Sequence, residues 1–134
     1  MNESMGRRLR ALVGHVNEAE AKLIEIFLSA IFAEISHEQH GDAVVSAITE
    51  TAAGEQTYDL VILNHELHGM HGIEVTRHLR EAGYEGPIIG TSAELSAWQK
   101  EEWTSAGADS FLPKPILYDR LLDIVLKFVA DHGL

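Results

Sequence analysis

Apolar residues follow two alternating patterns along the chain, and these patterns predict alternating strands and helices. Short runs of consecutive apolar residues are typical of strands buried on both faces of a parallel sheet. Longer segments with apolar residues three and four positions apart are typical of helices with one buried face. The expected strands are 9–14, 31–37, 59–64, 87–93 and 110–115, and the expected helices are 17–30, 41–53, 73–83, 96–107 and 117–132.

Residues at the ends of the helical segments support these boundaries. Asn17 is a predicted N-cap, and Glu20 follows it at the spacing of a capping box. Gly83 and Gly107 stand where the third and fourth helices are expected to close, and glycine is the preferred residue there. The helices are therefore predicted from both their apolar faces and their termini.

Five strand–helix units predict an α/β protein with a parallel sheet and helices on both faces. The best fit is a flavodoxin-like (βα)5 doubly wound sheet of strand order 2-1-3-4-5. It is expected over residues 8–131, after an N-terminal tail at 1–7. In such a sheet the functional crevice lies beyond the carboxyl ends of the first and third strands. His15 and Val16 follow the first strand and Asn64 ends the third, so all three are expected at the crevice.

The composition of the chain argues against a protein that binds nucleic acid or membrane. The chain has 134 residues, no cysteine, and 21 acidic against 10 basic side chains, which gives a net charge of −11. This charge opposes non-specific contact with nucleic acid or anionic membrane. No apolar run approaches the roughly 20 residues of a membrane span, and the basic N-terminus lacks the apolar core of a signal peptide. We therefore expect one cytoplasmic domain that binds neither nucleic acid nor membrane.

Five segments of the chain form a recognisable series, which is ALVGHVNEAEAKLI, YDLVILN, GMHGIEVTRHLR, PIIGTSA and AGADSFLPKPI. In order and spacing they resemble the receiver domain of two-component response regulators. The resemblance extends from about Arg8 to about Asp131 and implies the positions of a phosphorylation pocket. The acceptor falls on Asn64 and the acidic pair on His15 and Val16.

The resemblance implies a degenerate pocket, a pseudo-receiver. A working receiver holds magnesium with its acidic pair and acceptor aspartate, because this hard cation requires oxygen ligands. Here Val16 has no ligand atom, His15 offers a nitrogen, and Asn64 is a neutral amide with no nucleophilic carboxylate. We therefore expect a protein that binds no magnesium cofactor, accepts no phosphate and is not an enzyme.

Other parts of the receiver pattern are retained. The resemblance places the switch residues at Ser92 and Phe111, and the Lys-Pro pair at Lys114 and Pro115. One interpretation is structural: Lys114 bonds Asn64 and ties the third strand to the fifth, while Ser92 bonds locally. The alternative is a sensor whose vacated pocket binds a small ligand or a metal.

Three loop histidines, His65, His68 and His71, follow the third strand, and His15 is expected across the same crevice. Imidazoles are ligands for zinc, copper and nickel, so a transition-metal site is one interpretation. The other, which we prefer, is that these are exposed loop histidines, because no carboxylate or cysteine completes a tetrahedral set.

Two tryptophans on the fourth helical segment predict different roles. Trp103 is expected in the core, whereas Trp98 is expected to be exposed. Trp98 is either a contact for a partner protein or a single exposed aromatic residue without a partner. The resemblance implies partner and dimer contacts on the face of the fourth helix, fifth strand and fifth helix. We predict a phosphorylation-independent signalling module whose partner is a histidine kinase, a phosphotransfer protein, an output domain or a second copy.

Overall fold

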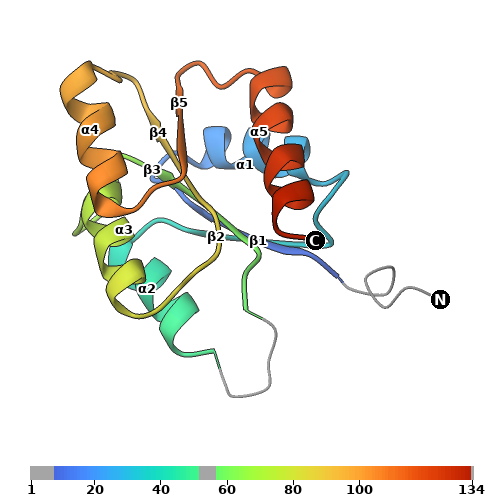
Figure 1. The fold of residues 1–134 in the computed structure, drawn as a ribbon, viewed down its shortest axis with the longest axis horizontal. Helices are drawn as coiled ribbons and strands as arrows, with labels where there is room; N and C mark the ends of the chain where they lie inside the picture. The colour runs from blue at the N-terminus through green and yellow to red at the C-terminus, as the bar shows by residue number, and fades with distance from the viewer. Residues whose placement is uncertain (1–7, 52–56, 134) are drawn as a thin grey trace.

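The computed structural model describes residues 8–51 and 57–133, and the tail expected at 1–7 lies outside them. Within these residues strands and helices alternate five times (Figure 1). None of these helices is long and apolar enough to cross a membrane. The elements are β1 (Arg10–Gly14), α1 (Glu18–Leu28), β2 (Glu34–Glu38), α2 (Gly41–Thr49), β3 (Leu60–Asn64), α3 (Gly72–Glu81), β4 (Ile88–Ser92), α4 (Ala97–Ala106), β5 (Ser110–Pro113) and α5 (Tyr118–Asp131).

The five strands form one parallel sheet of order β2-β1-β3-β4-β5, which confirms the predicted flavodoxin-like fold. Its register aligns the carboxyl ends of neighbouring strands. Gly14 of β1 pairs with Leu63 of β3, and Asn64 of β3 pairs with Thr91 of β4. His15, directly after β1, and Asn64 therefore reach the same edge of the sheet.

Helices cover both faces of this sheet. Figure 1 shows α1 and α5 together on one face, and α2, α3 and α4 on the other. The strand residues alternate accordingly: Val61 and Leu63 pack into one apolar core, while Leu60 and Ile62 pack into the second. Trp103 of α4 is fully buried in the first core, as the sequence predicts.

Two predicted boundaries are wrong by three residues or more. The second strand begins at Glu34 and not at residue 31, because residue 31 still belongs to the turn that follows α1. The backbone N–H groups of Ile31 and Phe32 both donate to Leu28 O, so neither residue is extended. Helix α2 ends at Thr49, while residues 52 and 53 of the expected helix lie outside the described residues.

Candidate functional site

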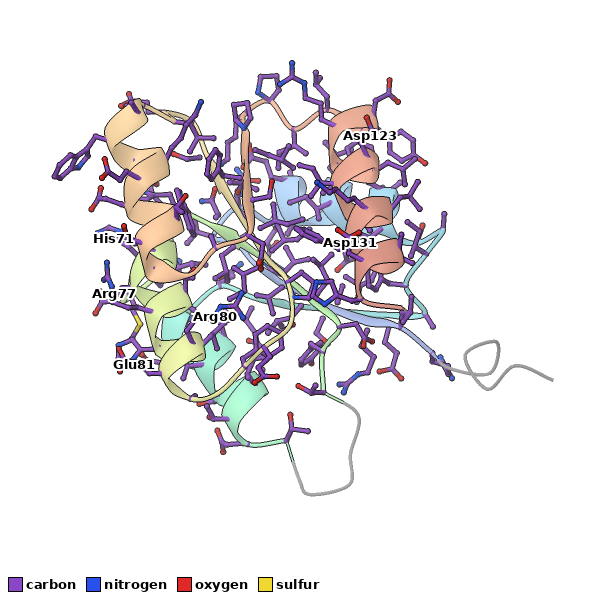
Figure 2. The ribbon with its side chains drawn as sticks, in the orientation of Figure 1. His71, Arg77, Arg80, Glu81, Asp123 and Asp131 are labelled. Carbon is purple, nitrogen blue, oxygen red and sulfur yellow. The ribbon has the colours of Figure 1, made fainter. Side chains whose placement is uncertain are left out.

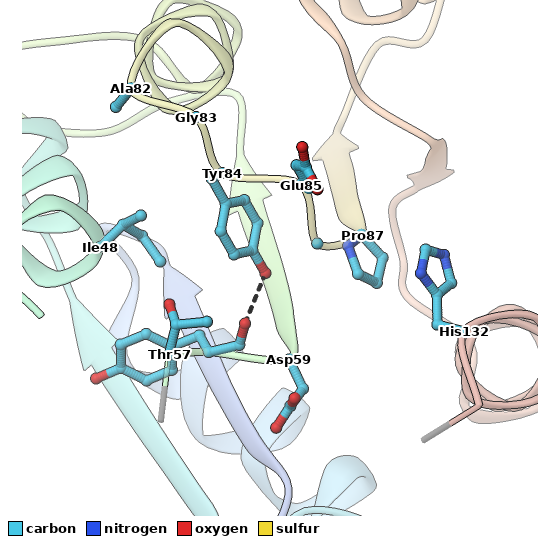
Figure 3. A pocket seen from close by; sticks show the side chains of 11 residues that line it. Ile48, Thr57, Asp59, Ala82, Gly83, Tyr84, Glu85, Pro87 and His132 are labelled. Carbon is cyan, nitrogen blue, oxygen red and sulfur yellow. Dashed lines mark hydrogen bonds between the residues drawn. The ribbon is translucent and has the colours of Figure 1, made fainter. Parts of the chain in front are cut away.

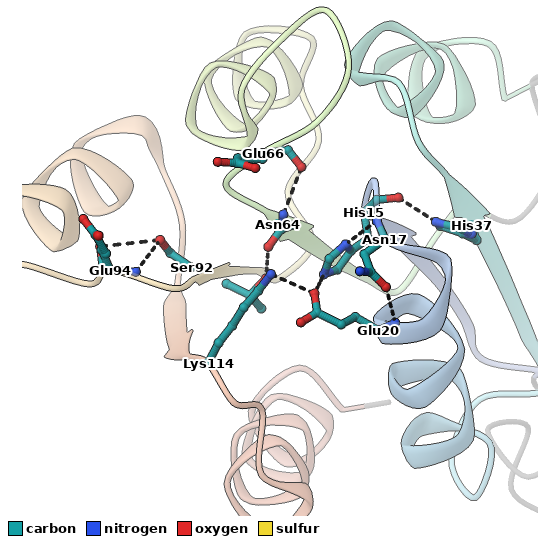
Figure 4. Close-up of polar contacts among 10 residues, drawn as sticks. His15, Asn17, Glu20, His37, Asn64, Glu66, Ser92, Glu94 and Lys114 are labelled. Carbon is teal, nitrogen blue, oxygen red and sulfur yellow. Dashed lines mark hydrogen bonds and ion pairs between the residues drawn. The ribbon is translucent and has the colours of Figure 1, made fainter.

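The crevice at the carboxyl edge of the sheet contains a hollow of about 330 Å³. Three of the predicted pocket residues line it, and they come from β3, from β4 and from the segment after β5 (Figure 4). Five other residues of the predicted site do not line this hollow, namely His15, Val16, Trp98, Phe111 and Pro115. The lining residues are Asn64, His65, Glu66, Ser92, Ala93, Glu94, Gln99 and Lys114.

Asn64 is buried, and both polar atoms of its amide are bonded. Its Nδ2 donates to the carbonyl oxygen of Glu66 at 3.0 Å, and its Oδ1 accepts from Thr91 Oγ1 at 3.2 Å. An aspartate at this position would place an oxygen against the Glu66 carbonyl, where only a donor can bond. The Asn64 amide therefore matches its two neighbours, a carbonyl acceptor and a hydroxyl donor, as a carboxylate would not.

His15 is buried and held from several sides. Its backbone N–H donates to Glu38 O at 3.0 Å, and its carbonyl oxygen lies 2.7 Å from a ring nitrogen of His37. The backbone N–H of Asn17 donates to His15 Nδ1 at 3.0 Å, which places the proton of the neutral ring on Nε2. His15 Nε2 lies 2.8 Å from Glu20 Oε2, but its N–H is not aligned well enough to count as a hydrogen bond.

The electrostatic surroundings of His15 favour the neutral ring. Burial, together with the positive charge of Lys114, lowers the pKa of His15 to about 4, although the Glu20 carboxylate opposes this shift. At neutral pH the contact between His15 and Glu20 is therefore one between a neutral ring and a carboxylate.

Glu20 is the site residue that the sequence interpretation missed. Lys114 Nζ donates to Glu20 Oε2 at 2.8 Å, and this ion pair lowers the pKa of Glu20 (Figure 4). The Asn17 side chain caps α1 by accepting from Glu20 N at 2.9 Å, as predicted. In a capping box the Glu20 carboxylate would bond the Asn17 N–H, but that group is taken by His15. The Glu20 carboxylate therefore does not complete a capping box and instead pairs with Lys114 in the crevice.

Through this ion pair Lys114 links the end of β5 to α1. Ser92 bonds locally, as the structural interpretation predicts: its Oγ accepts from Glu94 N at 3.2 Å. The Lys114–Pro115 peptide bond is cis. Phe111 is half-buried on β5, with Lys100 Nζ 5.8 Å from its ring centroid.

The four histidines considered as metal ligands have different neighbours. His65 and His71 stack at 5.2 Å, His68 lies beside His40 at 5.0 Å, and His15 contacts Glu20. In the described part of the chain, no group of three His, Asp or Glu side chains is positioned to hold a metal ion. The histidine spacing in the sequence therefore does not assemble a site.

The residues at the three predicted magnesium-ligand positions do not fit magnesium. His15 presents a nitrogen, Val16 an aliphatic side chain, and Asn64 an amide oxygen that already accepts from Thr91. The nearby carboxylate of Glu20 is bound to Lys114. A hard divalent cation requires several oxygen ligands, and these positions provide none that carries charge.

A larger hollow, of about 460 Å³, lies at the opposite edge of the sheet (Figure 3). Polar groups here bond one another: Tyr84 Oη donates to Tyr58 O at 3.0 Å, and Asp59 Oδ2 accepts from Arg10 N at 2.9 Å. Burial raises the pKa of the Tyr84 hydroxyl, so it remains a neutral donor. These groups join the amino ends of the strands to α3 and its loop, which is a structural role.

A doubly wound parallel sheet with a hydroxyl on β4 and a lysine after β5 at its carboxyl edge defines the class of receiver-like signalling domains. The model of the response regulator receiver domain family matches residues 18–126, and the chain belongs to this family. The match begins after His15 and Val16, the two positions that the resemblance assigns to the acidic pair.

Curated relatives support this assignment. The chain is 30% identical over 128 residues to the autoinducer 2 sensor kinase/phosphatase LuxQ of Vibrio vulnificus, covering 95% of this chain and 14% of that protein. It is 36% identical over 70 residues to two-component response regulator 24 of Arabidopsis thaliana, covering 52% of this chain and 50% of that protein. The chain thus spans about 14% of the length of the LuxQ protein.

Solved structures share the fold. The signal receiver domain of a LuxO repressor protein from Vibrio parahaemolyticus has a TM-score of 0.83 at 24% identity, covering 93% of this chain and 92% of that one. The receiver domain of sensor histidine kinase PA1611 from Pseudomonas aeruginosa has a TM-score of 0.77 at 23% identity, covering 92% and 99%. That receiver domain has a magnesium ion in its active-site cleft.

Proposed function

We propose that residues 8–131 form a phosphorylation-independent signalling module of a two-component system, a pseudo-receiver that acts by protein contact and not as an enzyme. The observation that carries this proposal is Asn64, which replaces the acceptor and whose two amide atoms are both bonded. An amide nitrogen or oxygen engaged in this way is neither charged nor free to attack phosphorus.

The ion pair between Lys114 and Glu20 supports the same proposal. In the receiver pattern this lysine contacts the incoming phosphoryl group, but here a carboxylate of the same chain lies 2.8 Å from its ammonium. A phosphoryl group would have to displace Glu20 and would find no magnesium to balance its charge. The internal carboxylate therefore replaces an external anion at this lysine.

The partners that fit this module are proteins of the same signalling systems. Relatives include LuxQ, a sensor kinase/phosphatase, and a response regulator of Arabidopsis thaliana. We propose a histidine kinase, a phosphotransfer protein or an output domain as the partner. Contact through the face of α4, β5 and α5, including contact with a second copy, is part of this proposal.

The test is exposure of the protein to acetyl phosphate and magnesium, followed by intact mass spectrometry. We expect no phosphoryl adduct on the native chain. The matched variant combines His15→Asp, Val16→Asp and Asn64→Asp and is expected to gain one adduct, at residue 64. A receiver with its own aspartate serves as the reagent control if that variant does not fold.

An adduct at Asn64 of the native chain would contradict the proposal. So would saturable magnesium binding in calorimetry that is lost in Asn64→Ala. Absence of both, with the reagent control phosphorylated, supports a module that signals without phosphate.

A further inference from the structure

Trp98 is the most exposed large hydrophobic side chain of the described residues. Its exposed fraction is 73%, whereas Trp103 on the same helix is completely buried. An isolated exposed tryptophan is costly to leave in water and is enriched at the centre of protein interfaces. Its surroundings therefore indicate what it can bind.

Helix geometry directs Trp98 toward α3 and away from β5. Trp98 lines a hollow of about 190 Å³ together with Glu101, Glu102 and Ser105 of α4, and with Arg77 of α3. The α4 residues of this set are spaced by three, four and seven positions from Trp98, so they share one side of the helix. Lys100, which lies over the Phe111 ring of β5, is on another side. Trp98 thus lies outside the α4–β5–α5 face that the resemblance implied for it.

The hollow continues along the two helices. A second hollow of about 430 Å³ is also lined by Arg77 and Glu102, and adds His65, His71 and Glu74. Because the two hollows share these residues, they form one depression between α3 and α4, which we call the α3–α4 groove. His71 and Arg77 mark its α3 side in Figure 2.

The α3–α4 groove is acidic. Its carboxylates are Glu74, Glu101 and Glu102, and Arg77 is its permanent cation. None of these four side chains forms an ion pair with another residue of the described ranges. Burial, together with the neighbouring His71, lowers the pKa of His65. That ring therefore adds little positive charge near neutral pH, and the unpaired carboxylates outnumber the guanidinium.

We propose that the α3–α4 groove binds a basic segment of a partner protein, with an arginine or lysine side chain over the Trp98 indole and facing Glu101 and Glu102. The indole face attracts cations, and a guanidinium also pairs with carboxylates through its fork of donors. The hollow at Trp98 is smaller than the roughly 300–1,000 Å³ of small-molecule pockets and suits a single side chain.

This inference rests on the proposed function in one respect, that the module works by protein contact. It adds a second contact face, the α3–α4 groove, and specifies the chemistry of the partner segment that meets it, a basic segment. It involves no phosphate, and Trp98, Glu101 and Glu102 do not line the crevice hollow, so the two experiments can fail separately.

The test is calorimetric titration of the full chain with an arginine-rich peptide at physiological salt. The matched peptide carries citrulline at every arginine position, which keeps the shape and removes the charge. We expect saturable binding of the arginine peptide alone. Amide shifts in NMR spectra are expected to cluster on α3 and α4. Binding of both peptides equally, binding of neither, or shifts confined to other elements would overturn the proposal.

Variants separate the groove from general attraction to an acidic protein. Glu101→Gln with Glu102→Gln removes two carboxylates from the groove, and Asp123→Asn with Asp131→Asn removes two from α5, far from His71 and Arg77 in Figure 2. We expect about tenfold weaker binding for the first pair and for Trp98→Leu, and less than about twofold for the α5 pair. Equal weakening by the two pairs would show that only net charge matters. Thermal unfolding checks that each variant is folded.

Discussion

His15 combines burial, a fixed tautomer and two oppositely charged neighbours. The ring is 1% exposed, accepts at Nδ1 and directs Nε2 to the oxygen that also binds Lys114. A protonated ring would stand close to the Lys114 ammonium in a place that water does not reach. The surroundings of His15, which stands at one predicted acidic-pair position, thus favour the uncharged ring.

This environment predicts a pH dependence of stability. The pKa of His15 is about 4 in the folded chain and near 6.5 when unfolded, so between these values the unfolded chain binds a proton that the folded chain does not. Stability is complete above about pH 6.5 and is lost as pH falls toward 4. We expect the free energy of unfolding to fall by about 2 kcal/mol between pH 7.5 and pH 5 through this residue. Urea unfolding of the native chain and of His15→Asn measures it, and equal pH dependence in both would contradict the assignment.

The neighbours of His15 predict opposite shifts in its pKa. Lys114→Met removes a positive charge and is expected to raise the pKa of His15, while Glu20→Gln removes a negative charge and is expected to lower it. NMR titration of the ring measures both. Lys22→Met is the matched control, because Lys22 is exposed and pairs with Glu25. An equal shift of the His15 pKa in Lys22→Met and in Lys114→Met would show that the shift follows the net charge and not the position of Lys114 near His15.

At the scale of elements, close packing fixes how β4 meets α4. A Cβ added to Gly90 would lie 2.6 Å from the indole of Trp103, so β4 carries no side chain there because the ring fills that space. Gly72 likewise allows close packing at the start of α3, because an added Cβ would lie 2.3 Å from Asn64 O. Two glycines therefore set the distance of these helices from the sheet and hence the shape of the crevice.

The contact between Gly90 and Trp103 predicts a non-additive pair of substitutions. Gly90→Ala is expected to destabilise the fold by about 1–3 kcal/mol, because the methyl group meets a rigid ring. Trp103→Leu is expected to cost about 3 kcal/mol by leaving a cavity. In the double variant the alanine occupies vacated space, so we expect it to be at least about 1 kcal/mol more stable than additivity predicts. Additive losses in urea unfolding would mean that the two residues do not interact.

Element patterns were sufficient to predict the strand order and the position of Asn64, because buried runs and the polar residues that end them are local signals. The positions of Ser92 and Lys114 were expected from the resemblance to receiver domains. The start of β2 was missed because Phe32 fits an alternating strand pattern as well as the turn after α1. Glu20 was missed because one spacing fits both a capping box and a side chain that reaches into the crevice. The direction of Trp98 depends on how α4 is rotated against α3, which no local pattern contains.

At the scale of the whole molecule, like charges dominate. The net charge of the chain is −11. Within the described residues, ion pairs such as Arg10–Glu34 and Arg80–Asp109 are few, and each attraction acts over a short distance. Such self-repulsion opposes the compact state and is screened by salt over about 10 Å at 0.1 M. The acidic surface also favours the encounter with a basic partner.

This balance predicts that salt stabilises the protein. We expect the free energy of unfolding to rise by about 1 kcal/mol from low ionic strength to roughly 0.3 M sodium chloride, because repulsion is screened more than the few ion pairs are. The variant Asp123→Asn with Asp131→Asn, which removes two negative charges, is expected to show a smaller rise. A fall in stability with salt would mean that attractive pairs outweigh the repulsion.

The contrast between the two indoles on α4 has a practical consequence. Trp103 is fully buried and Trp98 is largely in water, so their fluorescence emission is expected at well-separated wavelengths. The blue component follows the loss of the core during unfolding, and the red component follows events on the α3 side of the helix. The unlabelled protein therefore carries two optical probes, one for folding and one for ligand encounter, and Trp98→Phe assigns each signal to its residue.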